Sequence, residues 1–330
     1  MKYQNILNNK IQCTLCPRNC KLSYNQRGFC FVRRNAGNEI VLDTFGYNTG
    51  LAIDPVEKKP LYQFYPSSKV LSFGTLGCNM GCLFCQNSHI TKVQYDIKEN
   101  CDKISPEQII EIAKKYNCKC VAFTYNDPVI FFEYALSTAQ LCKEEGIKTI
   151  AVTAGYINEK PRKEFFNLMD SANIDLKGFS EEFYAKNCLA HLAPVLDTIK
   201  YAANETNCFI ELTTMIIEGE NDKYIEAECE WILENLGDSI PLHFSAFSPR
   251  YKFLNRPGTK IEALLKAYNM AKNMGIKHVY LGNLATLETS TTYCKDCSKP
   301  LIVRNGYNIL ENNLEGNKCK FCGNELEGLF

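Results

Sequence analysis

Hydrophobic and polar residues alternate along the middle of the chain in a way that predicts parallel β-strands joined by helices. Short runs rich in β-branched and aromatic residues are separated by longer helical stretches, which is typical of βαβ units. The expected strands are Val70 to Gly74, Val121 to Tyr125, Thr149 to Thr153, Asn173 to Lys177, Phe209 to Met215, Leu242 to Phe247 and Val279 to Leu281. Six or seven such units predict an α/β fold in the form of a partial (β/α)6-type TIM barrel.

Residues typical of helix ends stand between these strands. Ser105 stands directly before Pro106, and Gln108 follows three residues after the serine, so a capping box is expected at the start of one helix. A second helix is expected from about 129 to 145, because Gly146 stands where a C-terminal cap would. The active site of a parallel barrel lies at the carboxyl ends of its strands, so the residues after each strand are the candidates for function.

Polar side chains stand at several of these strand ends. Asn126 and Asp127 follow the second expected strand, where their oxygens suit an ammonium group, although either could instead cap the following helix. Thr153 ends the third strand. Asp175 and Lys177 lie two residues apart on the fourth, so both point to one face, and we expect them to pair because an unpaired interior charge is costly.

His243, one of four histidines in the chain, lies on the sixth expected strand. The strand alternates polar and apolar residues, which would direct this side chain to a single face. A contact to a cofactor or substrate and a hydrogen-bonded place in the core are equally compatible with this position. The sequence leaves both open.

The strongest chemical signal is the triad Cys78, Cys82 and Cys85, which forms a CxxxCxxC pattern on a glycine-flanked loop after the first strand. Three thiolates hold three corners of a [4Fe–4S] cluster and leave the fourth iron open to an external ligand. A zinc site is the alternative. Three cysteines leave a tetrahedral ion one ligand short, and His89 is the evident candidate for a fourth.

Two further groups of four cysteines flank the barrel. They are the N-terminal quartet, Cys13, Cys16, Cys20 and Cys30, and the C-terminal quartet, Cys294, Cys297, Cys319 and Cys322. The C-terminal quartet consists of two CxxC pairs around a β-like stretch and predicts a zinc ribbon, with rubredoxin-type iron as the competitor. The N-terminal quartet could hold zinc or a second iron–sulfur cluster, and the absence of a repeated CxxCxxC run favours zinc.

These groups also divide the chain. We expect a cysteine-rich metal-binding segment with its lead-in at 1–64, the barrel at 65–290 and the ribbon-like module at 291–330. The other seven of the 18 cysteines are expected to be small buried residues without a chemical role. They are Cys101, Cys118, Cys120, Cys142, Cys188, Cys208 and Cys229.

Composition and charge bear on the partners and the cellular compartment of the protein. The formal net charge is zero, which argues against a broad phosphate-binding surface and so against nucleic acid as a partner. No apolar stretch suggests a signal peptide or a membrane span. Eighteen cysteines in such a chain indicate metal ligands and reduced thiols, and therefore a cytoplasmic protein.

The triad, with Phe84 just before its last cysteine, resembles the signature of radical SAM enzymes. The runs GCNMGCLFCQN, TYNDP, IDLKGF and YLGN, together with residues 53–64, resemble the pyruvate formate-lyase activating enzyme-like branch. CTLCPRNC and the C-terminal YCKDC segment resemble the radical SAM component of the AmmeMemoRadiSam system. The resemblance covers essentially the whole chain.

This resemblance implies that S-adenosylmethionine (SAM) binds the open iron and is split reductively to a 5′-deoxyadenosyl radical. Phe84 would lie along the adenine, and Asn126 and Asp127 would hold the amine. Thr153, Asp175, Lys177 and His243 are the further expected contacts to the cofactor. The implied partners are a flavodoxin- or ferredoxin-type reductant, Memo-type and AMMECR-type proteins, and a substrate that is either a protein or a small molecule.

Two functions therefore remain. The first is a radical SAM enzyme that abstracts hydrogen from an unidentified substrate, in the manner of a glycyl-radical activase or on a small molecule. The second is a non-catalytic iron–sulfur and zinc protein that serves electron transfer or maturation in a multiprotein system. An intact open-site triad favours the enzyme.

Overall fold

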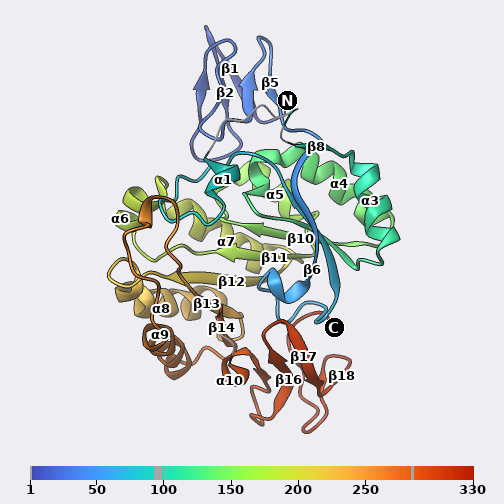
Figure 1. Cartoon of the computed structure of the whole chain (residues 1–330), viewed down its shortest axis with the longest axis vertical. Coiled ribbons are helices and arrows are strands. Elements are labelled where there is room, and N and C mark those ends of the chain that lie inside the picture. The colour runs from blue at the N-terminus through green and yellow to red at the C-terminus, as the bar shows by residue number, and fades with distance from the viewer. Residues whose placement is uncertain (1, 93–98, 100, 284–285) are drawn as a thin grey trace.

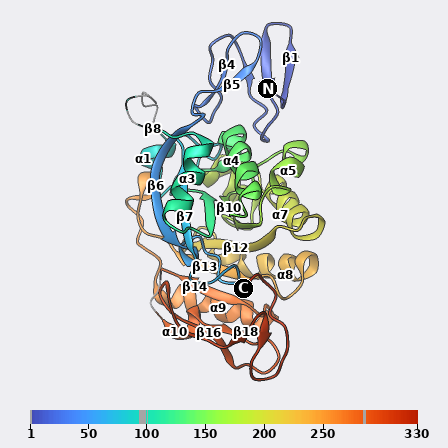
Figure 2. The ribbon, with the colours of Figure 1, turned by 90° about the vertical axis from the view of Figure 1, so that its right-hand side faces the viewer.

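The computed structural model describes residues 2–92, 99, 101–283 and 286–330. Three parts follow one another along its long axis, with a small β-rich N-terminal segment at one end and a β-rich C-terminal module at the other (Figure 1). The larger α/β part lies between them, and the view turned by 90° shows the same order (Figure 2).

The central part is built on one nine-stranded sheet, in which seven consecutive neighbours are parallel. The parallel strands are β7 (Lys69–Gly74), β9 (Cys120–Phe123), β10 (Lys148–Thr153), β11 (Ser171–Asp175), β12 (Phe209–Ile216), β13 (Leu242–Ala246) and β14 (Val279–Gly282). They match the seven expected strands within a few residues. In the described chain β14 forms one edge and does not pair with β7, so the barrel is partial, as the sequence predicts.

Two antiparallel strands extend the other edge. They are β6 (Tyr47–Pro55), which pairs with β7, and β8 (Asp102–Lys103), which pairs with β6. Residues 47–55 of the expected N-terminal segment and its lead-in therefore belong to the main sheet.

Helices fill the connections between the parallel strands, and the longer ones pack on the outer face of the sheet (Figures 1 and 2). They are α1 (Ser88–Thr91), α3 (Pro106–Lys115), α4 (Phe132–Glu144), α5 (Glu159–Phe166), α6 (Glu181–Phe183), α7 (Ala193–Glu205), α8 (Ile225–Leu236) and α9 (Ile261–Met274), and the short α10 (Leu287–Ser290) follows β14. Ser105 and Gln108 form the expected capping box of α3. Gly146, with φ of +69°, follows α4 as the expected cap, although the helix is preceded by the 3₁₀ turn η2 (Pro128–Phe131).

The N-terminal segment contains two small antiparallel sheets. They consist of β1 (Gln4–Leu7), β2 (Lys10–Cys13) and β3 (Lys21–Leu22), and of β4 (Arg33–Asn35) and β5 (Ile40–Leu42). Arg33 anchors this segment to the barrel, because its buried guanidinium donates to the Ile130 carbonyl oxygen at 2.9 Å and to the Glu133 carboxylate at 2.6 Å. Sequence-distant residues thus fix the segment against η2 and α4.

The C-terminal module is a second small β-structure with its own core. Its strands are β15 (Thr292–Tyr293), β16 (Pro300–Asn305), β17 (Asn308–Asn312), β18 (Leu314–Glu315) and β19 (Lys318–Cys319). Arg304 on β16 is fully buried, and its guanidinium donates to the Tyr62 carbonyl oxygen at 2.5 Å and to the Thr292 hydroxyl at 2.8 Å. The same guanidinium lies 3.7 Å from the buried Glu57 carboxylate, so an ion pair joins the module to the segment after β6.

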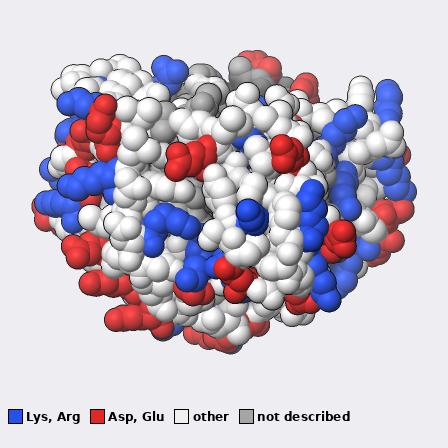
Figure 3. Space-filling model, turned by 90° about the horizontal axis from the view of Figure 1, so that it is seen from below, with Lys and Arg blue, Asp and Glu red and all other residues white. Residues whose placement is uncertain are grey.

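Charged side chains of both signs are interspersed over the face seen from below, without one continuous basic area (Figure 3). This agrees with the zero formal net charge. No helix in the described part of the chain is long and apolar enough to cross a membrane.

One buried carboxyl group in the barrel wall predicts a pH dependence of stability. Glu228 on α8 accepts a 2.5 Å hydrogen bond from Thr214 on β12, and burial raises its pKa from 4.5 to about 8. The folded state therefore keeps a proton that the unfolded state releases, so the free energy of unfolding should fall as the pH rises from about 4.5 to about 8. The total fall attributable to this group is at most about 5 kcal/mol.

Urea unfolding of the wild type and Glu228→Gln at several pH values checks this expectation. The amide keeps the shape of the carboxyl group but does not titrate, so its unfolding free energy should change less over that interval. Equal pH dependence in the two proteins would contradict the assignment.

Candidate active site

Residues 75–87 run from β7 to α1 and carry the cysteine triad. The Asn126 amide holds the start of this loop, because its nitrogen donates to the Thr75 hydroxyl and to the Gly77 carbonyl oxygen, both at 3.1 Å. Gly77 has φ of +85°, and a Cβ there would lie 2.1 Å from the Cys30 carbonyl oxygen. The start of the loop therefore requires glycine.

The other side of the loop is held by η3 (Tyr184–Cys188), a single turn of π-helix after β11. The Gly81 amide donates to the Cys188 carbonyl oxygen at 2.8 Å, and the Leu83 amide donates to the Asn187 carbonyl oxygen at 2.9 Å. The triad is thus fixed between two parts of the barrel before any metal binds.

The three thiols line one cavity, with Cys78 and Cys82 buried and Cys85 half-buried. A hydrogen bond with the Cys188 thiol lowers the pKa of Cys82 to about 6, and the charge of Lys177 acts in the same direction. Burial raises the pKa of Cys78 to about 12. Because a metal binds thiolates, loading this site would release protons.

The cavity has a volume of about 630 Å³, which is within the range of small-molecule sites. It lies at the carboxyl ends of the parallel strands, where the sequence places the site. Lys58 contributes to it from the segment after β6, and Tyr307 reaches it from the C-terminal module.

Asn126 and Asp127 both line the cavity, but their side chains also have partners within the protein. The Asp127 carboxylate accepts from the Val129 amide at 3.0 Å, which caps η2, and from the Ala154 amide at 2.9 Å. The Thr153 hydroxyl donates to the same carboxylate at 3.1 Å. The capping interpretation is confirmed, and an additional bond to an amine stays a prediction.

Asp175 and Lys177 form the expected pair, with 2.6 Å between the carboxylate oxygen and the ammonium nitrogen. Burial is the largest single influence and acts to lower the pKa of Lys177, but the Asp175 charge, the Cys82 thiolate and the hydrogen bond to Asp175 together raise the net pKa. Both residues line the cavity, as does Phe84, which packs against Phe183 and Phe253 with ring centres 5.9 and 6.0 Å apart.

His243 also lines the cavity, although only 2% of its surface is exposed. Its Nε2 lies 2.6 Å from a carboxylate oxygen of Glu211, whose other oxygen accepts from the amides of Tyr62 and Gln63 at 2.8 Å each. The Tyr62 ring packs edge-on against the imidazole at 4.8 Å. His243 is therefore a hydrogen-bonded core residue at the cavity wall, and its contact to a cofactor stays a prediction.

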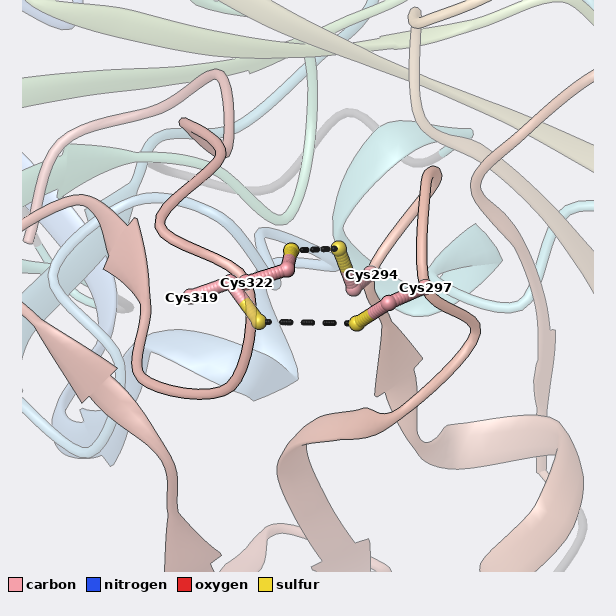
Figure 4. A group of neighbouring side chains, drawn as sticks. All are labelled: Cys294, Cys297, Cys319 and Cys322. Atoms are coloured by element: carbon pink, nitrogen blue, oxygen red, sulfur yellow. Dashed lines mark hydrogen bonds between the residues drawn. The ribbon is translucent and has the colours of Figure 1, made fainter.

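The C-terminal quartet is a compact metal-binding group (Figure 4). Its four sulfur atoms lie within 4.8 Å of one another, with 3.6 Å between Cys294 and Cys322 and 3.7 Å between Cys297 and Cys319. Four sulfurs around one tetrahedral ion with bonds of about 2.3 Å stand about 3.8 Å apart. The quartet could therefore hold one mononuclear ion.

We expect protein purified without oxygen to carry one tightly bound zinc ion per chain at this quartet. Cys322→Ser should lose the zinc and make the C-terminal module sensitive to protease before the barrel, because thiolate zinc stabilises so small a module. Zinc analysis and limited proteolysis check this. Finding iron at the quartet in the wild type would overturn the zinc assignment.

The four thiols of the N-terminal quartet surround a separate small cavity, which Asn79 of the triad loop also lines. Arg18 crosses between the two sites, because its Nε donates to the Asn79 carbonyl oxygen at 2.6 Å. The quartet and the triad thus lie on two sides of one stretch of backbone.

Two comparisons with known proteins indicate the family of this chain. Residues 73–232 match the model of the Radical SAM superfamily. An uncharacterised protein of Methanocaldococcus jannaschii, MJ0808, is 38% identical over 331 residues, which cover 99% of this chain and 98% of that protein. Residues 73–232 therefore form a domain of the radical SAM superfamily, whose members are enzymes.

Two solved structures can be set beside this fold. SuiB of Streptococcus suis bound to S-adenosylmethionine is 12% identical, with a TM-score of 0.53 over 73% of this chain and 56% of that chain. A domain of a pyruvate-formate lyase-activating enzyme from Bacteroides vulgatus is 18% identical, with a TM-score of 0.43 over 50% of this chain and 99% of that chain. The likeness to SuiB shows that the two chains share a fold.

Some residues of the site escaped sequence reasoning. Cys188 was expected to be a buried cysteine without a role, yet its thiol contacts Cys82. Glu211 is the partner of His243, and Tyr307 comes from a module expected to be separate from the chemistry. The alternation of Glu211 and Thr213 along β12 was a signal that Glu211 faces the site, but it could not identify His243 as the partner.

Proposed function

We propose that this protein cleaves SAM reductively at a [4Fe–4S] cluster held by Cys78, Cys82 and Cys85 and uses the product radical to abstract hydrogen from a substrate. One observation carries the proposal: the three thiols face a cavity of about 630 Å³ at the carboxyl ends of the parallel strands. Three thiolates leave one iron open, and the cavity provides space for its external ligand. When bound, the cluster supplies the electron that splits the sulfonium.

The chain positions SAM with groups that already line the cavity. The turn at Asn126 and Asp127 presents oxygen atoms for the amine, while Lys177, held by Asp175, provides a positive charge for the carboxylate. Phe84 offers an apolar surface for the adenine. Tyr307 lines the cavity from the C-terminal module, where it would limit the access of water to a reactive intermediate.

The experiment that tests this function measures 5′-deoxyadenosine and methionine after the anaerobically reconstituted protein is reduced in the presence of SAM. Both products are expected. A protein that carries a full cluster but forms neither would instead be an electron-transfer or maturation component.

The substrate and partners are part of the proposal. We infer a substrate that is a protein glycine or a small molecule, and a flavodoxin- or ferredoxin-type reductant. The N- and C-terminal sequence resemblance to the AmmeMemoRadiSam system supports Memo-type and AMMECR-type proteins as partners.

A prediction separates amine binding from capping at Asp127. Asp127→Asn keeps one oxygen to cap η2 but loses the charge and the acceptor for the Ala154 amide, so affinity for SAM should fall by about 1.5–3 kcal/mol while the iron–sulfur absorption stays. Equilibrium binding of SAM to the reconstituted protein measures this change.

Ser105→Ala is the matched control, because it removes the cap of α3, which does not line the cavity. It should cost about 1 kcal/mol of stability and leave SAM affinity unchanged. If Asp127→Asn behaves as this control does, the amine site lies elsewhere, at the ends of β10 or β11.

A further inference from the structure

The N-terminal quartet differs from the C-terminal quartet in the spacing of its thiols. Among the described residues, the four sulfur atoms of the C-terminal quartet lie within 4.8 Å of one another, but the N-terminal quartet does not form such a compact group. The triad that we assign to a cubane does not form one either. Thiolates on a cubane each bind a different iron, so they stand farther apart than thiolates on a single ion.

The N-terminal thiols enclose a small cavity. Cys13, Cys16, Cys20 and Cys30 all line it, and its volume is about 20 Å³. Apolar side chains such as Leu15, Phe29, Val129 and Ile130 form much of the remaining wall. An apolar shell around four separated thiols suits a cluster, because it limits the access of solvent and so tunes the reduction potential.

Hydrogen-bond donors and charge are also arranged around these thiols. Backbone amides of Leu15 and Arg18 donate to the sulfurs of Cys13 and Cys16, and the amides of residues 32 and 33 donate to the sulfur of Cys30. The buried Arg33 guanidinium adds a positive charge close to Cys13 and Cys30. Such hydrogen bonds and charges stabilise cluster sulfurs and tune the reduction potential.

From this geometry we infer that the N-terminal quartet holds a second [4Fe–4S] cluster with four cysteine ligands, and that zinc is confined to the C-terminal quartet. This reverses the preference for zinc that the spacing in the sequence suggested. Four ligands leave no open iron, so this cluster would not bind SAM.

The position of the site gives the second cluster a role. A Cβ on Gly77 would lie 2.1 Å from the Cys30 carbonyl oxygen, and the Arg18 side chain donates to the Asn79 carbonyl oxygen. The backbone of the triad loop therefore lies between the two cysteine sites. A cluster here would accept one electron from a flavodoxin- or ferredoxin-type protein and pass it to the triad cluster, without making or breaking a bond. This role rests on the proposed function, whereas the identity of the metal does not.

Metal analysis and EPR spectroscopy of anaerobically reconstituted protein test the inference. The wild type should contain about eight irons and one zinc per chain. A variant with Cys78, Cys82 and Cys85 all changed to Ala should keep about four irons and a dithionite-reduced EPR signal that does not respond to SAM. Adding Cys16→Ser and Cys20→Ser to that variant should remove the remaining iron and leave the zinc.

A wild type with about four irons and two zincs would overturn the inference, and this measurement needs no variant to fold. A triad variant without iron but with two zincs would overturn it independently. Eight irons without any cleavage of SAM would leave the second cluster in place and refute the proposed function instead.

Discussion

Cys82→Ala should abolish both the triad cluster and the formation of 5′-deoxyadenosine. The two remaining thiols of the triad cannot hold a cube that needs three protein ligands, and the loop offers no other thiol to the cavity. The Cys188 thiol contacts Cys82 but does not line the cavity, so it should not substitute. Iron content and product formation from SAM measure the effect.

Cys229→Ala is the matched control, because Cys229 is a fully buried cysteine on α8 and does not line the cavity. Iron content and cleavage of SAM should both persist in that variant. Cleavage that survives in Cys82→Ala would refute the assignment of the triad.

The largest expected effect on stability is at Arg304. Arg304→Met removes the positive charge beside the buried Glu57 carboxylate, whose pKa burial already raises and the arginine lowers. It also leaves the Tyr62 carbonyl oxygen and the Thr292 hydroxyl without this donor. Removing one partner of a buried pair costs about 3–5 kcal/mol, which denaturant unfolding can measure.

Lys163→Met provides the comparison, because the Lys163–Glu159 pair at 3.3 Å is largely exposed. Its loss should cost less than about 1 kcal/mol. Glu57→Gln combined with Arg304→Met should recover part of the stability, since no buried charge is then left alone. A cost at Arg304 no larger than that at Lys163 would contradict the proposed docking contact.

The fold could be predicted to the extent that local patterns determine it. Runs such as Phe209–Ile216 are apolar and β-rich, and Ser105 and Gln108 define a helix start by themselves. β6 has no such pattern, because its place in the sheet depends on pairing with β7. The π-helical turn η3 was also not anticipated, since its role is to bind the distant cysteine loop.

The site likewise contains residues that a local pattern predicts and residues that only the folded chain brings together. The spacing of the triad predicts its chemistry, because a loop of eight residues brings its own ligands together. Cys188 and Glu211 come close to their partners only through the closure of the barrel, so no local pattern could have paired them. The distances between the N-terminal thiols are likewise a property of the folded segment. They lead us to infer an iron–sulfur cluster where the spacing in the sequence favoured zinc.

The most direct test of the account is the EPR spectrum of the reduced protein with and without SAM, recorded in the Cys16→Ser/Cys20→Ser variant so that the triad cluster is observed alone. An open iron at Cys78, Cys82 and Cys85 predicts that SAM changes the signal, because its amine and carboxylate bind that iron directly. A full-strength cluster signal that SAM leaves unchanged would contradict the central claim.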